Sequence, residues 1–558
     1  MKRAIPFLLI CSSLLAEDNA LHDFRTQAKT FYQEFIREQD DVHATVHAGN
    51  NSSSHPAPPT PPTPPTPPSP FVPPPNPYTP PANPPAPTAI SGYLPMVIVN
   101  DSGFADSAVY VSVIGTQVTG ATASSQQMYM TFSTLGLGSY TNVASSGTGS
   151  VPIMALDTLN TAMAPHTYAI YIPADNNGSN GISGARIYFE INSDTTLITY
   201  SDGKLQEPTV LNQNIPFYSL TFDKFEFAYL PNASPEIGAD ATAVDYFSVP
   251  LYGYLSTPDP GSPSNSGLYE PQSYVMKTVV PAYFDAKCTG THRSAILTQW
   301  NNLISPDPSS PVRVLSPGNA MSVGTDSTFP NKFDPNYFDN AIAYGFSLLQ
   351  YLWSDPTSAY YRSHGLYFQI PPSTKYPQPG TCPANDISGV YTATIQSNNY
   401  MYFCPVFTTE TQSYFPAPTI TGATSPTSNG PTSYLIFSAQ NLNPNFAANL
   451  QGNQVSKLFE EAMIAGLLPA TFTSTVPLSN TYLADNSSNY YSNASSLPTY
   501  AGGPWYDVYS QAIHYCGPIY AYGFDEPLYP GVLMQCTTLT ASTYIGITIG
   551  TCDLVPGY

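Results

Sequence analysis

From residue 89 onward the chain is dominated by short runs in which apolar and polar residues alternate. Clear examples are "ARIYFEIN" (185–192), "FYSLTFDKFEFAYL" (217–230) and "VDYFSVPLYGYL" (244–255), and turn residues separate such runs. A period of two is typical of strands that bury one face. Many short strands with regular turns indicate an all-β sandwich or barrel.

A different pattern follows this β-rich part. Three later segments have helical periodicity, at 292–304, 336–353 and 455–468, and each is long enough for a helix. Strand-like runs return between them and after residue 505. We therefore expect a mainly β protein, with a β barrel or sandwich lobe beside a mixed α/β lobe.

The N-terminal region predicts export. Two basic residues, a short apolar run and small residues up to Ala16 are typical of a secretory signal peptide. Cys11 follows Ile10, which is not small, so we expect no lipid anchor. The apolar run is too short to span a bilayer. We predict a secreted or cell-surface protein.

Two further segments precede the β-rich part. Residues 17–50 contain a short amphipathic pattern, which indicates either a docking element or a marginal helix. Residues 51–88 are proline-rich and predict an extended, semi-rigid spacer, because proline has no backbone N–H. The predicted organisation is 1–16 signal peptide, 17–50 helix, 51–88 linker, 89–285 β lobe, 286–504 mixed lobe and 505–558 closing strands that return to the β lobe.

Composition narrows the range of partners. Lys and Arg number 16 against 37 Asp and Glu, giving a formal net charge of −21, which argues against nucleic acid and anionic membranes as ligands. Without Cys11, six of the seven cysteines remain, and an even number in an exported chain suggests up to three disulfides. No cysteine or histidine spacing indicates a metal site, and we expect no cofactor and no membrane span.

Two acids lie inside aromatic, strand-like runs. Glu226 stands between Phe225 and Phe227, and Asp245 between Val244 and Tyr246. If the aromatic residues face the core, alternation directs both acids to the outer face, where a hairpin could bring them to one groove. Such a pair suits glycoside cleavage, although exposed strand acids give the same pattern. Three further acids are expected in or near turns as ordinary surface residues: Asp223, Glu236 and Asp240.

Several segments, in order, resemble one family. "RIYFEINSD", "FEFAYLPNAS" and "AVDYFSVPLYG" are similar to β-1,3-glucanases of glycoside hydrolase family 64. "VRVLSPGNAM", "NYFDNAIAYGFSLLQYLW", "GVYTATIQSNNYMYF" and "IHYCGPIYAYGFDEPLYPG" continue the similarity across roughly residues 95–555. The last of these segments also resembles the closing region of thaumatin-like proteins.

This resemblance implies a thaumatin-like β barrel or sandwich lobe and a mixed α/β lobe that together form a wide groove for β-1,3-glucan. It further implies an inverting, endo-type hydrolase in which Glu226 is the general acid and Asp245 the general base. We expect a monomer. The alternative is a non-catalytic glucan-binding or cell-surface protein on the same scaffold.

Other residues are candidates for sugar contact. His514, Asp525 and Glu526 could line the groove, although Asp525 could equally cap a turn. Arg313 could bind substrate or one of the acids, or serve as a structural partner. Tyr229 and Tyr246 are possible stacking platforms, or core residues.

Overall fold

The computed structural model describes most of the β-rich part of the chain. The described residues are 73–119, 122–174, 181–208, 219–231, 236–288, 293–305, 311–322, 333–334, 337, 367–369, 390–395, 400–405, 413–416, 436–437, 460–466, 506–523 and 531–555. The predicted signal peptide, the N-terminal helix and the first part of the proline-rich tract lie outside them. So do Asp525, Glu526 and nearly all of the predicted helix at 336–353.

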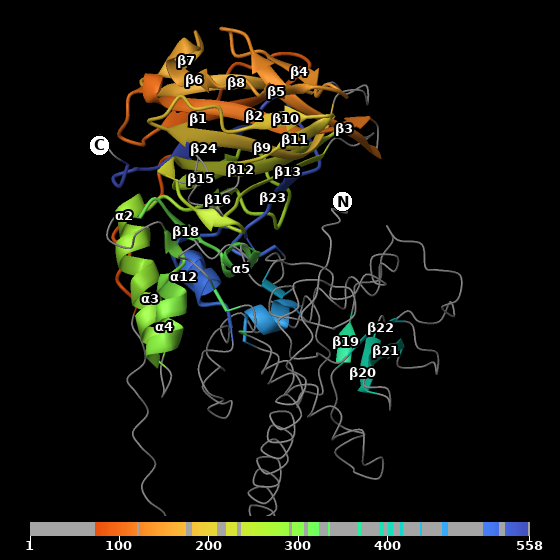
Figure 1. Ribbon diagram of the computed structural model, residues 1–558. Helices are drawn as coiled ribbons and strands as arrows, with labels where there is room; N and C mark the ends of the chain where they lie inside the picture. Colours follow the sequence, from red (N-terminus) through yellow and green to blue (C-terminus); the bar gives the residue numbers. More distant parts are fainter. Residues whose placement is uncertain are drawn as a thin grey trace, which may run out of the picture.

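Two large sheets form the body of the protein (Figure 1). The six-stranded sheet has the order β16 (Asn265–Gly267), β15 (Leu251–Leu255), β24 (Ile545–Ile549), β1 (Tyr93–Asn100), β8 (Thr167–Pro173) and β7 (Ala162–Ala164). The eight-stranded sheet has the order β23 (Met534–Cys536), β13 (Glu236–Ala241), β12 (Thr221–Leu230), β9 (Gly181–Ile191), β2 (Val109–Thr119), β3 (Thr122–Phe132) and β4 (Gly138–Asn142), with β6 (Met154–Ala155) beside β2. Among the described residues no sheet closes into a barrel. Of the predicted barrel and sandwich, only the open arrangement of two sheets is therefore found.

The sheets face each other across a shared apolar core. Phe225 of β12 lies against Gly253 of β15, where an added Cβ would come within 2.5 Å of the ring. Glycine is therefore required at this close approach. Strand β1 is apolar almost throughout because it pairs on both sides, in parallel with β24 and antiparallel with β8. Strands from the end of the chain thus complete both sheets.

The structure also describes three smaller sheets and two short turns. One three-stranded sheet consists of β11 (Lys204–Gln206), β10 (Thr199–Ser201) and β5 (Thr148–Ser150), another of β14 (Tyr246–Phe247), β18 (Arg313–Leu315) and β17 (Ile304–Ser305), and a four-stranded sheet of β19 (Tyr367–Gln369), β20 (Val390–Ile395), β21 (Tyr400–Pro405) and β22 (Ser413–Pro416). Short 3-10 turns occur at η1 (Asp106–Ala108) and η2 (Leu156–Thr158).

The helices lie together below the sheets in Figure 1. They are α2 (Gln272–Tyr274), the π-type turn η4 (Val275–Val279), α3 (Val280–Lys287), α4 (Arg293–Asn301), α5 (Pro317–Ser322) and α12 (Val508–Cys516). The helix predicted at 292–304 is present as α4. Trp300 of α4 anchors this region, since it is fully buried and packs against Phe284 and Phe333 with ring centroids 5.3 and 4.7 Å apart.

The cysteines do not form the predicted bridges among the described side chains. Cys288, Cys516, Cys536 and Cys552 are all buried thiols. No disulfide therefore joins any two of these four. Within the part of the chain that the structure describes, no helix combines the length and apolar character that a membrane span requires.

Glu190 of β9 is a buried acid whose side-chain oxygens have no hydrogen-bond donor of normal geometry among the described residues. It is 2% exposed. Burial raises the pKa of Glu190 to about 7, and the nearby Ser193 hydroxyl and Thr195 amide oppose this only in part. The folded state thus holds a proton that the unfolded state releases near the ordinary glutamate pKa of about 4.3.

This difference gives a testable pH dependence. Because the folded-state pKa of Glu190 is raised, its protonated form favours folding at low pH, and stability falls as the pH rises from about 4 through about 7. Glu190→Gln should therefore be more stable than the parent at pH 8, by up to about 3 kcal/mol, and similar to it at pH 4.5. Denaturant unfolding at both values measures this, with Glu236→Gln as the control. An equal difference at both pH values would contradict the assignment.

Candidate active site

The two predicted acids meet on one face of the eight-stranded sheet. Along β12 the side chains of Phe225, Phe227 and Tyr229 are buried, whereas Glu226 is half-buried. The predicted alternation is confirmed: the aromatic residues enter the core and Glu226 points to the opposite face. We call this the outer face and define it by Arg186, Lys224 and Glu226.

Lys224 joins the two carboxylates. Its Nζ contacts Asp245 Oδ2 and lies 3.6 Å from Glu226 Oε1. Lys224 Nζ is closer to Asp245 Oδ2 than to Glu226 Oε1. The two carboxylate oxygens therefore lie less than 7.2 Å (2 × 3.6 Å) from each other. The ammonium is almost completely enclosed, with 6% of the side chain exposed. A buried charge of this kind requires paired partners, and the two acids supply them.

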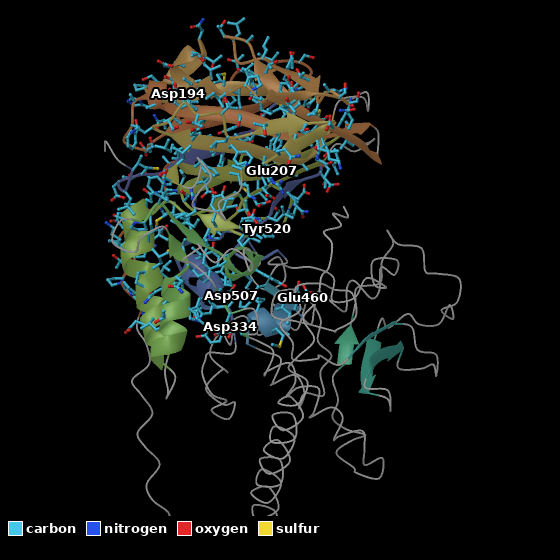
Figure 2. The ribbon with its side chains drawn as sticks, viewed as in Figure 1. Asp194, Glu207, Asp334, Glu460, Asp507 and Tyr520 are labelled. Carbon is cyan, nitrogen blue, oxygen red and sulfur yellow. The ribbon has the colours of Figure 1, made fainter. Side chains whose placement is uncertain are left out.

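Glu226 has a second cationic neighbour. Arg186 of β9 is its register partner and donates from Nε to Glu226 Oε1 at 3.0 Å. The same guanidinium contacts Glu207, which also accepts a hydrogen bond from the Tyr188 hydroxyl. Glu207 lies over the eight-stranded sheet in Figure 2. Arg186 therefore contacts the same Glu226 oxygen as Lys224, and Glu207 fixes Arg186.

Asp245 is held from the other side of the site. It lies directly before β14, whose pairing with β18 places Tyr246 opposite Leu315. Asn319 of α5 donates from Nδ2 to Asp245 Oδ1 at 2.9 Å and to the Asp245 carbonyl at 2.9 Å. The Ser316 amide donates to the same carbonyl at 3.0 Å. Backbone and side chain of Asp245 are thus both fixed.

The surroundings of Asp245 keep it ionised. Burial acts to raise its pKa, but the Lys224 charge, hydrogen bonds from Lys224 and Asn319 and the Arg186 charge outweigh burial, so the pKa lies below its usual value. Protein atoms crowd this carboxylate, yet 43% of its side-chain surface is open to solvent. Asp245 is thus held by Lys224 and Asn319 while part of its side chain remains accessible to a ligand.

Asp223 anchors the segment that follows Asp245. The sequence predicted a surface acid near a turn, and this prediction is wrong: Asp223 is 2% exposed on β12. Its Oδ2 accepts hydrogen bonds from the amides of Ser248 at 2.7 Å and Val249 at 3.0 Å. Burial raises the pKa of Asp223 to about 7, against these hydrogen bonds and the Lys224 charge. Glu236 begins strand β13 and Asp240 lies within it, and both are partly exposed.

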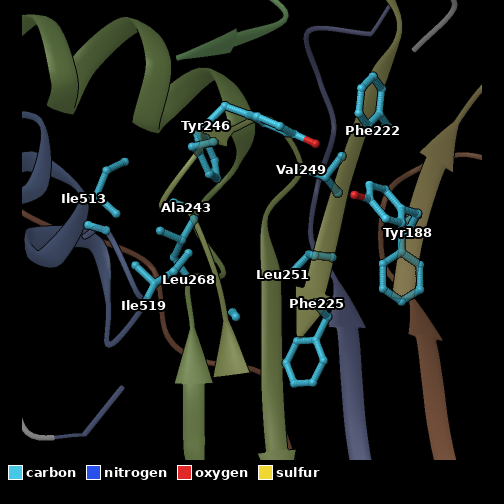
Figure 3. Close-up of a cluster of buried hydrophobic side chains, with 14 of the residues drawn as sticks. Tyr188, Phe222, Phe225, Ala243, Tyr246, Val249, Leu251, Leu268, Ile513 and Ile519 are labelled. Atoms are coloured by element: carbon cyan, nitrogen blue, oxygen red, sulfur yellow. The ribbon is translucent and has the colours of Figure 1, made fainter. Parts of the chain in front are cut away.

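Most other predicted sugar contacts lie in the interior. Tyr229 is fully buried, Tyr246 is 5% exposed and packs edge-on against Phe222 at 5.7 Å (Figure 3), and His514 of α12 is 6% exposed. Arg313 is fully buried, donates to the Leu220 carbonyl and lies 5.2 and 5.7 Å from the Phe222 and Tyr246 ring centroids. This burial supports a packing role for all four side chains.

Sequence patterns missed the residues that hold the acids. Lys224 could have been recognised, because it shares the face of Glu226 two positions away. Arg186, Glu207 and Asn319 come from other elements, and only the strand register and the position of α5 bring them here. Among the described residues no group of three or more His, Cys, Asp or Glu side chains could hold a metal ion.

Comparison with known proteins defines the class. The family model described as beta-1,3-glucanase of glycoside hydrolase family 64 matches residues 92–347, the region that contains Glu226 and Asp245. The chain is a glycoside hydrolase. The resemblance to family 64 that the sequence motifs indicate is confirmed over this region.

Solved structures agree with the fold. A laminaripentaose-producing beta-1,3-glucanase, crystallised with laminaritetraose, matches with a TM-score of 0.53 and 17% identity, over 83% of this chain and 99% of its own. A beta-1,3-glucanase domain from Clostridium beijerinckii matches with a TM-score of 0.47 and 15% identity, over 84% of this chain and 100% of its own. The comparison with curated proteins gave no match. The mainly β architecture is therefore shared with the first of these structures.

The support of Asp245 by Asp223 can be tested by mutation. Asp223→Ala should leave the buried amides of Ser248 and Val249 without acceptors, at a cost of about 1–3 kcal/mol each. Asp223→Asn retains one acceptor oxygen and should lose less. Chemical denaturation would measure both variants, with the exposed Asp157→Ala as the control. Equal stability of Asp223→Ala and the parent would mean that these hydrogen bonds do not hold the segment.

Proposed function

We propose that this protein hydrolyses β-1,3-glucan with Glu226 as the general acid and Asp245 as the general base of an inverting reaction. The observation that carries the proposal is the shared contact of both carboxylates with Lys224 Nζ on an accessible face. The family match supports the substrate class. We further propose that the protein is exported to the cell surface or medium and acts as a monomer.

The proposed reaction is a single displacement. Asp245 takes a proton from water as the oxygen attacks the anomeric carbon, while Glu226 gives its proton to the departing glycosidic oxygen. Negative charge thereby moves from Asp245 to Glu226. Because Lys224 Nζ lies beside both carboxylates, its positive charge can stabilise whichever of them is ionised. The charge of the pair then changes little during the reaction, so little solvent needs to rearrange.

A neutral polymer suits this protein as a substrate. The formal net charge is −21, which would repel polyanions but exerts no net force on a glucan. The cations near the acids are engaged with carboxylates rather than exposed for anion binding. Hydroxyl groups of a sugar can donate to the remaining carboxylate lone pairs.

Removing either carboxylate should abolish most turnover. Glu226→Gln and Asp245→Asn keep the side-chain shape but cannot transfer the proton, so we expect kcat on laminarin to fall by about 10²–10⁴. Reducing-end release measures this, and Glu236→Gln on the neighbouring strand is the control. Full activity in both variants would overturn the assignment. Proton NMR of the first products tests stereochemistry, for which we expect the α-anomer.

Lys224 gives a separate pH test. In Lys224→Met, burial of Asp245 persists but the main charge that lowers its pKa is lost, so that pKa should rise. Asp245 would then be protonated at higher pH, and the acidic limb of the kcat profile should move upward. The measurement is kcat on laminarin from about pH 3 to about pH 8, which spans the usual carboxyl range. A lower kcat with an unmoved acidic limb would contradict this role.

A further inference from the structure

The end of the proline-rich tract is attached to the domain. Residues 73–84, which we call the proline arm, have no helix or strand of their own. They contact α2 and α12 and reach β24, an inner strand of the six-stranded sheet. The sequence predicts an extended, semi-rigid spacer up to residue 88. Contacts to three elements far away in the chain hold residues 73–84 of it.

Three tyrosine hydroxyls donate to carbonyls of the arm. Tyr515 of α12 donates to Pro74, Tyr274 of α2 to Pro75 at 2.7 Å, and Tyr544, directly before β24, to Pro84 at 2.7 Å. Proline has no N–H, and an extended polyproline chain has no internal hydrogen bonds, so its backbone carbonyls are the only groups that can form hydrogen bonds with a binding site. A tyrosine suits such a chain, because its hydroxyl can donate to a carbonyl while its ring packs against the apolar proline rings.

Packing complements these hydrogen bonds. The Tyr78 and Tyr274 rings meet edge to face at 5.1 Å. Pro84 is buried against Gly546, where an added Cβ would lie 2.7 Å from the proline ring. Only glycine leaves room for the proline here. The contacts thus combine shape and hydrogen bonding at both ends of the arm, at residues 74–78 and at Pro84.

One contact sets the register. Asn76 Nδ2 donates to Glu270 Oε1 at 2.6 Å, and Glu270 is 4% exposed. Asn76 also accepts from the Tyr78 amide at 3.0 Å, which shapes the local turn. A polyproline chain that slid by one residue would withdraw the Asn76 amide from Glu270 Oε1. The buried carboxylate would then keep only its backbone donors, among them the Tyr269 amide at 3.1 Å from Oε2, and losing a side-chain donor at a buried charge is costly.

We propose that Tyr274, Tyr515, Tyr544 and Glu270 form a binding site for a proline-rich segment, filled by the proline arm of the same chain. The site recognises a Pro-Pro-Asn-Pro-Tyr pattern in the polyproline conformation. Its function is to fix the point at which the proline-rich linker leaves the folded domain. This site is distinct from the acid pair and does not depend on the proposed glucan hydrolysis.

Limited proteolysis of the full chain tests the attachment. Chymotrypsin can cleave between Tyr78 and Thr79, and the docked arm should be cut at least about tenfold more slowly than a synthetic peptide of residues 70–90, because opening must precede cleavage. The double variant Tyr274→Phe, Tyr515→Phe should restore faster cleavage. Tyr140→Phe, which removes a tyrosine hydrogen bond to Pro173 elsewhere in the protein, should not. Cleavage of the parent as fast as the peptide would overturn the proposal.

Binding in trans tests the recognition pattern. In the full chain, residues 73–85 are replaced by glycine and serine, and a synthetic peptide PPPNPYTPPANPP is titrated by calorimetry. Saturable binding is expected, weakened at least about fivefold by Asn76→Ala in the peptide and unchanged by Asn83→Ala. Absence of saturable binding, or equal loss from both peptide changes, would rule out a register-specific site.

Discussion

One ammonium group, Nζ of Lys224, determines the arrangement of this site. It is enclosed by protein, and a buried cation without counterions would be strongly unfavourable. Asp245 and Glu226 provide those counterions from two different parts of the chain. The attraction of both carboxylates to Lys224 therefore offsets the repulsion between their own charges and allows them to lie close together.

Strand geometry converts this local pairing into a rigid site. Lys224 and Glu226 share one face of β12 because they are two residues apart, while Phe225 between them enters the core on the other face. A shift of register by one residue would exchange these faces and bury Glu226 among aromatic rings. Asp223, on the core side of the same strand, holds the amides that follow Asp245. One short strand thus fixes both the site and its support.

The sequence allowed one half of the site to be predicted. Alternation in the Phe225–Phe227 run was sufficient to place Glu226 outside the core, and the family resemblance singled out Asp245. Alternation did not describe Asp245 itself, since the strand begins only at Tyr246 and has two residues. The partners Arg186 and Asn319 depend on strand register and on helix α5, which local patterns do not contain.

The limits of local sequence patterns also explain why the aromatic and basic residues predicted to contact sugar are buried in the structure. Tyr229, Tyr246 and Arg313 have the chemistry of sugar-binding residues, but burial, which a single sequence does not reveal, places them in the core. A guanidinium can be buried there because aromatic faces and a backbone carbonyl surround it.

Scarcity of cations makes their placement informative. Only 16 of the 558 residues are Lys or Arg, yet Arg186 and Lys224 both contact Glu226, and Lys224 contacts Asp245 as well. In a chain with excess negative charge, two adjacent carboxylates without cations would not both stay ionised, because like charges raise one of the two pKa values. The Lys224 charge instead lowers the pKa of Asp245 and favours its ionised state. The position of one lysine along a strand thus allows two carboxylates to lie close together in a strongly acidic chain.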